Sequence, residues 1–154
     1  DAFDQLGDDI DLWIAGEGPD TAALQARTQR DSRIHWLGRV TDEDKIARLR
    51  GADVFCAPSL GGESFGVVLI ESMAAGTTVV ASGLDGYRNV ATHDQDALLV
   101  EPGDAGALAA AIKRALDDDD LTKRLRANGL LRAFDFSMST LVDHYVRIYR
   151  ALIV

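Results

Sequence analysis

The stretch GGESFGVVLIE, residues 61–71, decides the fold of this chain. It follows the apolar run Asp53–Ala57, which is typical of a buried strand, and a proline at position 58. From Gly66 to Ala75 the residues are almost wholly apolar, so this segment predicts a buried helix without a face for water. A strand that leads through a short glycine-containing loop into a helix is typical of a parallel α/β sheet.

Two glutamates mark the ends of this stretch. Glu63 precedes the predicted helix, and Glu71 lies inside it, where a carboxylate needs a partner or a cleft. The first amides of the helix, at residues 66–68, have no intrahelical acceptors and lie at the positive end of the helix dipole. We therefore expect a phosphate at the start of the helix, with the two glutamates binding hydroxyl groups on either side.

This arrangement resembles the E-x7-E motif of the retaining GT-B glycosyltransferases of family four. Within that family, the run CAPSLGGESFGVVLIESMAAGTTVVAS, residues 56–82, is most similar to the actinobacterial phosphatidylinositol mannosyltransferases. The resemblance extends over nearly the whole chain, but only over the C-terminal, donor-binding half of such an enzyme. It implies a nucleotide sugar, GDP-mannose, as substrate and no tightly bound cofactor, and it leaves a divalent-metal requirement open.

Length and charge restrict the possible functions. The 154 residues suit one domain, residues 1–154, with a sizeable core. A formal net charge of −9 argues against nucleic-acid binding and against direct contact of this domain with an anionic membrane. A single cysteine forms no internal disulfide, which favours a cytoplasmic protein. The resemblance implies that a full-length enzyme is peripherally bound to the inner face of the plasma membrane.

Hydrophobic periodicity predicts alternating strands and helices. Strands are expected at residues 11–15, 34–37, 53–57, 78–82 and 97–100, and helices at 20–30, 42–50, 66–75, 86–90, 105–116, 121–132 and in the final segment. Thr41 is the expected N-cap of the second helix, with Ile46 and Leu49 toward the core. Asp117–Asp120 is expected to be a solvated link. The predicted fold class is α/β, a doubly wound, Rossmann-like parallel sheet.

The resemblance also implies a missing strand. In the family, the donor domain opens with a strand and a basic turn, G-R-x-x-x-x-K-G, and nothing like it precedes Asp11. In the doubly wound order that strand lies between the strands at 11–15 and 53–57. We therefore expect a gap there, with Asp1–Gly7 as the end of a first helix and the cationic clamp for the diphosphate absent. Direct pairing of these two strands would contradict the expectation.

The resemblance assigns roles to the motif residues. Glu63 is the catalytic residue, which positions the transferred sugar and stabilises its oxocarbenium-like charge, while its role as a nucleophile is disputed. Glu71 binds the ribose hydroxyls. The main-chain amides of Ser64, Phe65, Gly66 and Val67 bind the diphosphate and sugar, and Gly66 allows close approach of the ligand. The residues alone leave two alternatives open: Glu63 as a complement to the helix dipole, and Glu71 as a buried carboxylate bonded to local backbone.

A second group of candidates follows the strand at 34–37. The resemblance implies that the backbone of Val40 meets the nucleotide base, and that Asp42 and Lys45 match the polar edges of guanine. Helix capping and a solvated lysine are the alternative. Gly16 lies at the same edge of the sheet and is a further donor-binding candidate, but the glycine that a dinucleotide-binding G-x-G-x-x-G pattern requires is replaced by Thr21. The three histidines are scattered, so we expect no metal site.

Taken together, these features favour the donor-binding domain of a retaining glycosyltransferase that transfers mannose from GDP-mannose to phosphatidylinositol. The lipid acceptor is then bound by an N-terminal domain absent from this chain, and the chain alone is expected to be inactive. A family-four transferase that uses a UDP-sugar is an alternative, as is a nucleotide-sugar-binding module without turnover. A nicotinamide-dependent oxidoreductase is disfavoured because the glycine pattern fails.

Overall fold

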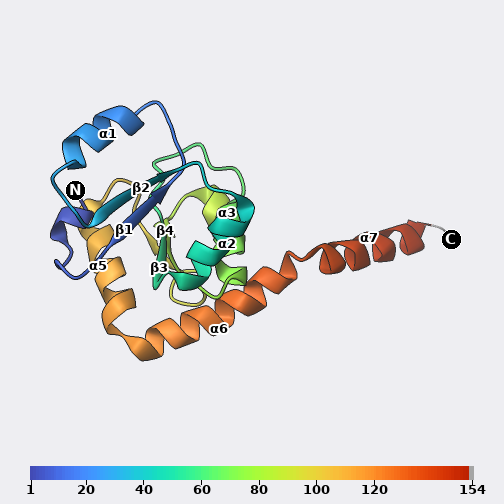
Figure 1. The fold of residues 1–154 in the computed structure, drawn as a ribbon. Coiled ribbons are helices and arrows are strands. Elements are labelled where there is room, and N and C mark those ends of the chain that lie inside the picture. The colour runs from blue at the N-terminus through green and yellow to red at the C-terminus, as the bar shows by residue number, and fades with distance from the viewer. Residues whose placement is uncertain (153–154) are drawn as a thin grey trace.

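The computed structural model describes residues 1–152, in which strands and helices alternate along the chain (Figure 1). The strands are β1 (Leu12–Ala15), β2 (Ile34–Gly38), β3 (Val54–Ala57), β4 (Thr78–Ser82) and β5 (Leu98–Val100). The helices are η1 (Phe3–Gln5), α1 (Thr21–Thr28), α2 (Asp42–Gly51), α3 (Val67–Ala74), α4 (Asp85–Arg88), α5 (Ala105–Asp117), α6 (Asp119–Asp135) and α7 (Met138–Leu152). Every predicted strand is present, and the α/β fold class is confirmed.

The strands form two parallel sheets instead of one. β1 pairs with β2, and β3, β4 and β5 form a second sheet in that order. Within residues 1–152, β1 and β3 do not pair with each other, so the gap expected between these two strands is present. The segment expected to end a first helix contains only the single 3-10 turn η1.

β4 is the centre of the core because both of its faces are covered. All five of its residues are buried. Val79 and Ala81 pack in one hydrophobic cluster with Leu69 of α3, whereas Val80 packs in a second cluster with Leu125 of α6. A strand buried on both faces needs a continuous apolar run, which explains the sequence TVVAS without polar alternation.

Side-chain caps fix where several helices begin. The hydroxyl of Thr41 accepts a hydrogen bond from the Asp44 amide at 3.1 Å, as predicted. The carboxylate of Asp118 accepts from the Leu121 amide at 2.9 Å and begins α6 directly after α5. The segment Asp117–Asp120 is exposed, as expected, but it is not a link of four residues, because Asp117 ends α5, Asp119 begins α6 and only Asp118 lies between them.

The packing of α2 also differs from the prediction. Leu49 is buried and its carbonyl accepts a hydrogen bond from the Thr77 hydroxyl, but Ile46 is 45% exposed. The prediction that Ile46 faces the core is wrong. Only the last part of α2 is covered by the rest of the described chain, so Leu49 is the one buried residue of this helix. The charged majority of α2 consequently stays at the surface.

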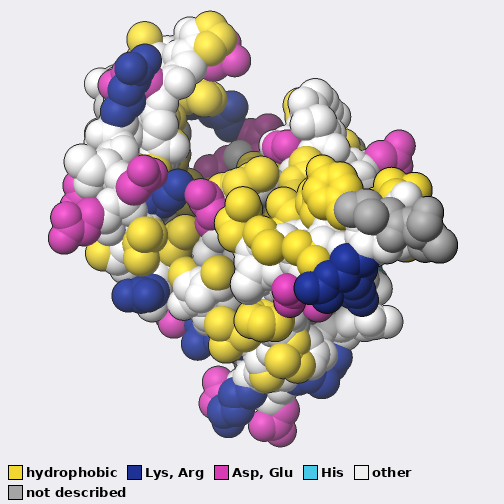
Figure 2. All heavy atoms as spheres, turned by 90° about the vertical axis from the view of Figure 1, so that its right-hand side faces the viewer, with side chains coloured by type: hydrophobic (Ala, Val, Ile, Leu, Met, Phe, Trp, Pro, Cys, Tyr) yellow, Lys and Arg dark blue, Asp and Glu magenta, His cyan; other side chains and the backbone are white. Residues whose placement is uncertain are grey.

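α7 extends away from the rest of the molecule (Figure 1). Its apolar stripe is exposed at Leu141, Tyr145, Ile148, Tyr149 and Leu152. Figure 2, which views the molecule from the side of α7, shows hydrophobic side chains gathered on this face. Among residues 1–152, no helix is both long enough and apolar enough to cross a membrane.

Candidate functional site

The segment between β3 and α3 places Glu63 at the start of α3. Gly66 adopts a left-handed conformation with φ of 91°, which turns the chain into the helix. The Gly66 amide donates a hydrogen bond to the Glu63 carboxylate at 3.2 Å. This amide was predicted to be free for a phosphate and is instead occupied. The amides of Val67 and Val68 have no acceptor among residues 1–152.

Glu71 points from α3 toward α2. Its Oε1 lies 2.9 Å from Nζ of Lys45, and the same ammonium lies 3.3 Å from the carboxylate of Asp42. The hydrogen bond with Glu71 is the main cause of the raised pKa of Lys45. Because the partner of Glu71 is a side chain of another helix, the alternative of a glutamate bonded to local backbone is wrong.

The first turn of α3 is more exposed than the apolar sequence predicts. Val67 is 58% exposed, whereas Leu69 and Met73 are buried. Ser64 is exposed as well, and the ring of Phe65 meets that of Phe136 edge-on, with centroids 5.7 Å apart. The exposed first turn therefore leaves the Val67 amide, which has no acceptor among residues 1–152, open to a ligand.

The structure gives a reason for a glycine at position 66 that the sequence did not indicate. A Cβ at this position would lie 2.8 Å from Cδ1 of Tyr87. The glycine is thus required by its positive φ and by the tyrosine ring against it. The tyrosine ring is a cause that does not depend on a ligand, and the close approach of a ligand to Gly66 stays a prediction.

The carboxyl ends of β1 and β2 bring the second group of candidates together. The Gly16 amide donates to the Gly38 carbonyl at 2.7 Å, which places Gly16 beside the segment that leads to Val40. Val40 is half-buried, and Asp42 is exposed with its carboxylate turned to Lys45. The Lys45–Glu71 pair then links this group to α3, so the predicted site residues form two groups that meet at this pair.

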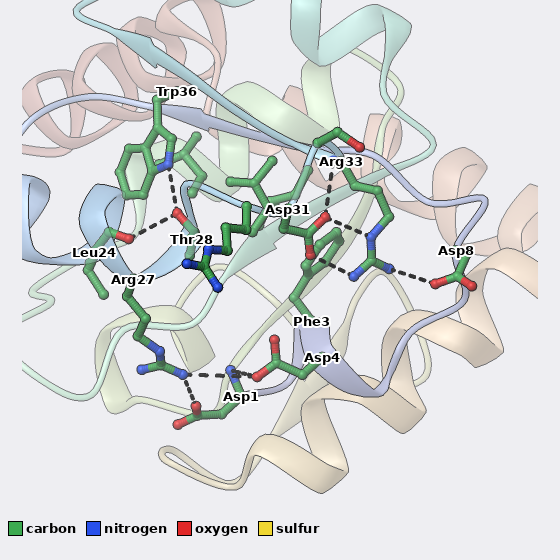
Figure 3. Close-up of a pocket in the computed structure, with 15 residues that line it drawn as sticks. Asp1, Phe3, Asp4, Asp8, Leu24, Arg27, Thr28, Asp31, Arg33 and Trp36 are labelled. Atoms are coloured by element: carbon green, nitrogen blue, oxygen red, sulfur yellow. Dashed lines mark hydrogen bonds and ion pairs between the residues drawn. The ribbon is translucent and has the colours of Figure 1, made fainter.

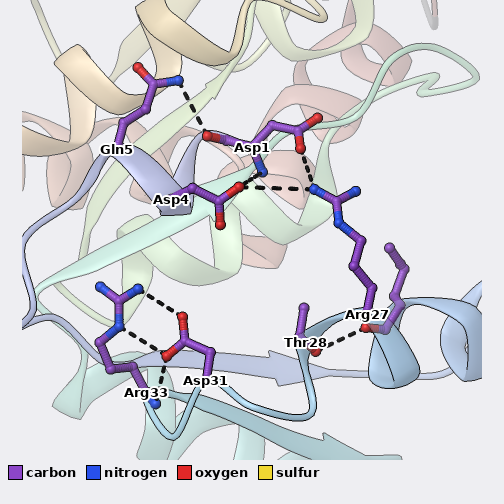
Figure 4. Close-up of polar contacts among 8 residues, drawn as sticks. Asp1, Asp4, Gln5, Arg27, Thr28, Asp31 and Arg33 are labelled. Atoms are coloured by element: carbon purple, nitrogen blue, oxygen red, sulfur yellow. Dashed lines mark hydrogen bonds and ion pairs between the residues drawn. The ribbon is translucent and has the colours of Figure 1, made fainter.

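A pocket of about 730 Å³ lies elsewhere, between η1, α1, β1 and β2 (Figure 3). None of the predicted site residues lines it. Two of its three arginines are paired with carboxylates: Arg27 pairs with Asp1, and Arg33 pairs with Asp31 at 2.7 Å (Figure 4). We therefore keep the exposed edge around Glu63 and Glu71 as the candidate site. Among residues 1–152, no three His, Cys, Asp or Glu side chains form a metal-binding group.

Two residues near Glu63 were missed by the sequence analysis. Tyr87 of α4 is 2% exposed, and its hydroxyl lies 3.1 Å from Oγ of Ser59. Burial is the main cause of the raised pKa of Tyr87, and the nearby Glu63 carboxylate raises it further. No motif marked this tyrosine, because its contact with Ser59 joins segments that are distant in sequence.

Comparisons with known proteins show the family of this chain. The family model "Glycosyl transferases group 1" matches residues 1–132. A phosphatidyl-myo-inositol mannosyltransferase of Mycobacterium leprae is 42% identical over 145 residues, which cover 94% of this chain and 39% of that protein. The lipopolysaccharide core biosynthesis glycosyltransferase LpsD of Rhizobium meliloti is 37% identical, over 90% of this chain and 40% of that protein. The chain thus spans about two fifths of the length of these curated relatives.

Solved structures give the same fold. HepE of Anabaena, in complex with UDP, matches with a TM-score of 0.87 at 21% identity, over 97% of this chain and 43% of that one. Sucrose-phosphate synthase of Thermosynechococcus elongatus matches with a TM-score of 0.79 at 31% identity, over 92% of this chain and 38% of that one. With a family model that matches most of its residues and relatives above 30% identity, the chain belongs to the group 1 glycosyl transferase family.

Proposed function

We propose that this chain is the donor-binding domain of a retaining glycosyltransferase that transfers mannose from GDP-mannose to phosphatidylinositol. The observation that carries the proposal is the placement of two carboxylates around the start of α3. Glu63 lies at the helix start beside the Gly66 amide, and Glu71 lies on the face toward α2. The 42% identity with the mannosyltransferase of Mycobacterium leprae supports mannose as the sugar.

The two carboxylates bind different parts of the donor in this proposal. Glu63 positions the transferred sugar through its hydroxyls and stabilises the positive charge that develops on the ring as the bond to phosphate breaks. Glu71 accepts hydrogen bonds from the ribose hydroxyls. The amides of Ser64, Phe65 and Val67 receive the diphosphate, because the exposed helix start favours an anion, and the Gly66 amide joins them when the Glu63 carboxylate turns from it to the sugar.

The second group of residues binds the base. The backbone of Val40 and the side chains of Asp42 and Lys45 meet guanine, with Gly16 at the same edge. Lys45 already contacts both Asp42 and Glu71, so it can exchange one carboxylate for the nucleotide when the donor binds. A positive charge at this position also offsets the carboxylates around it, which would otherwise repel a diphosphate.

The acceptor belongs to another part of the enzyme in this proposal. An N-terminal domain binds the lipid, and the transferase works in the cytoplasm, at the inner face of the plasma membrane. This chain without that domain binds the donor but does not turn it over, because catalysis requires both substrates held together.

Amide NMR titrations of this chain with GDP, UDP and NAD test the donor site. We expect saturable shifts at Val40, Gly66 and Glu71 with GDP. A Glu71→Gln variant should weaken the response, whereas Glu43→Gln, which alters an exposed glutamate on α2, should not. Stronger binding of UDP would overturn GDP-mannose and keep a UDP-sugar. Binding of NAD alone would overturn the glycosyl-donor site.

A further inference from the structure

The segment that carries Glu63 has few ties to the rest of the chain. Among residues 1–152, Pro58–Phe65 make no backbone-to-backbone hydrogen bonds outside the regular helices and strands. Its polar contacts are the bond from Gly66 to Glu63 and the bond between Ser59 and Tyr87. A segment without its own backbone bonds takes its position from its neighbours.

α4 supplies the closest of these neighbours. A Cβ at Gly86 would lie 2.4 Å from the carbonyl oxygen of Glu63 and 2.9 Å from the carbonyl carbon of Ser64. The backbone of α4 is therefore in direct contact with the peptide group that joins these two residues. A side chain at position 86 has no room there, because the atoms that it would meet are backbone.

Tyr87 holds both ends of the same segment. Its hydroxyl is 3.1 Å from Oγ of Ser59 at the beginning, and its ring lies against Gly66 at the end. Glu63 lies between these two anchors. The Glu63 carboxylate is close enough to contribute to the raised pKa of Tyr87, after the larger effect of burial. Because Tyr87 is 2% exposed, displacing its hydroxyl from Ser59 would cost a hydrogen bond that water at this buried residue does not readily replace.

We propose that Tyr87 is a positioning residue that fixes the Glu63 carboxylate at the start of α3 through the hydrogen bond with Ser59 and the contact of its ring with Gly66. This inference rests on the function proposed above for Glu63. Tyr87 touches no substrate in this arrangement. It acts by restricting the positions of a segment that its own backbone does not hold, and a displaced catalytic group loses much of its rate effect.

The test is Tyr87→Phe, which removes the hydroxyl and keeps the ring against Gly66. In the full-length enzyme that contains this domain, we expect kcat to fall roughly tenfold, the effect of about one lost hydrogen bond. The KM for GDP-mannose should change much less than kcat, because Glu71 and Lys45, which are proposed to bind the nucleoside, are untouched. Ser59→Ala should give the same fall, and the double variant should be no worse than either single variant. Tyr145→Phe, on exposed α7, is the matched control.

NMR of the isolated chain gives a second measurement. Tyr87→Phe should shift and broaden the amide signals of Ser59, Glu63 and Gly66 while its affinity for GDP stays that of the parent chain. Equal kcat in Tyr87→Phe and Tyr145→Phe would overturn the positioning role. A parallel loss of kcat and GDP affinity would overturn it as well, since that pattern indicates general disruption of the fold.

The outcome of Glu63→Ala separates this inference from the function on which it rests. If Glu63→Ala retains the parent turnover, the proposed catalytic role of Glu63 fails. If Glu63→Ala loses turnover and Tyr87→Phe does not, only the positioning role of Tyr87 fails.

Discussion

The ammonium of Lys45 lies 2.9 Å from the carboxylate of Glu71 and joins α2 to α3. The two side chains are 33% and 38% exposed, so water screens their attraction. Exposed ion pairs of this kind contribute about 0–1 kcal/mol to folding. The pair is therefore a weak stabiliser of the fold, and its main consequence is to hold the Glu71 side chain toward the edge where the donor is proposed to bind.

Glu71→Gln should separate folding from binding. Because both side chains are about a third exposed or more and water screens the ion pair, we expect the free energy of unfolding in urea to change by less than about 1 kcal/mol. Hydrogen bonds that involve a charged group are stronger than neutral ones, so the affinity for GDP, measured by calorimetry, should fall roughly tenfold. Glu43→Gln serves as the control for the loss of one negative charge. Unchanged affinity in Glu71→Gln would remove Glu71 from the donor site.

Gly66→Ala should disturb the start of α3. The residue has φ of 91°, and the added Cβ would lie 2.8 Å from the ring of Tyr87. We expect a loss of about 1–3 kcal/mol in the free energy of unfolding, from backbone strain and from overpacking against a buried ring. Gly61→Ala is the matched control, since no atom lies within 4 Å of its added Cβ. Equal stability of the two variants in urea would contradict this account.

Local patterns were enough to predict the elements but not their contacts. Every strand was predicted because each is a short apolar run bounded by turn residues, and the run TVVAS marks a strand that is buried on both faces. The gap between β1 and β3 followed from the resemblance and the doubly wound order. The exposure of Ile46 was not predictable, since it depends on how little of α2 is covered.

The candidate site shows the same division. The motif around Glu63 and Glu71 was visible because its residues are close in sequence. The link from Glu71 to Lys45 and the contact of Gly66 with Tyr87 were not, because each joins two segments that meet only in the folded chain. Sequence reasoning therefore assigned Gly66 to ligand approach and missed the tyrosine that requires it.

Gly86→Ala should displace Glu63 without touching the nucleotide side of the site. The added Cβ would lie 2.4 Å from the carbonyl oxygen of Glu63, and the segment must move to relieve this contact. We expect turnover of the full-length enzyme to fall while GDP binding persists, with a loss of about 1–3 kcal/mol in stability from overpacking. Gly51→Ala is the control, because its Cβ would meet no atom within 4 Å. Turnover equal to that of Gly51→Ala would show that the segment tolerates the shift.

Cys56 in β3 makes stability depend on pH in alkaline solution. Burial raises the pKa of its thiol from 9.0 to about 11. Between these values the unfolded chain loses the thiol proton while the folded chain keeps it, so the stabilisation is complete below pH 9.0 and is lost as the pH rises toward about 11. A shift of one pKa unit corresponds to about 1.4 kcal/mol.

Cys56→Ala removes this dependence. Between about pH 8 and about pH 10, the parent chain should lose about 1 kcal/mol more of its unfolding free energy than the variant does. Urea unfolding followed by circular dichroism, in the presence of a phosphine reductant, measures both losses. The pKa of Tyr87 is also raised by burial, but this residue is present in both proteins and its contribution cancels in the comparison. The comparison uses the loss of unfolding free energy between the two pH values and not the stability at either one. The substitution also leaves a small cavity, which lowers stability equally at both pH values. Equal losses in the two proteins would mean that the Cys56 thiol titrates alike in the folded and unfolded chains.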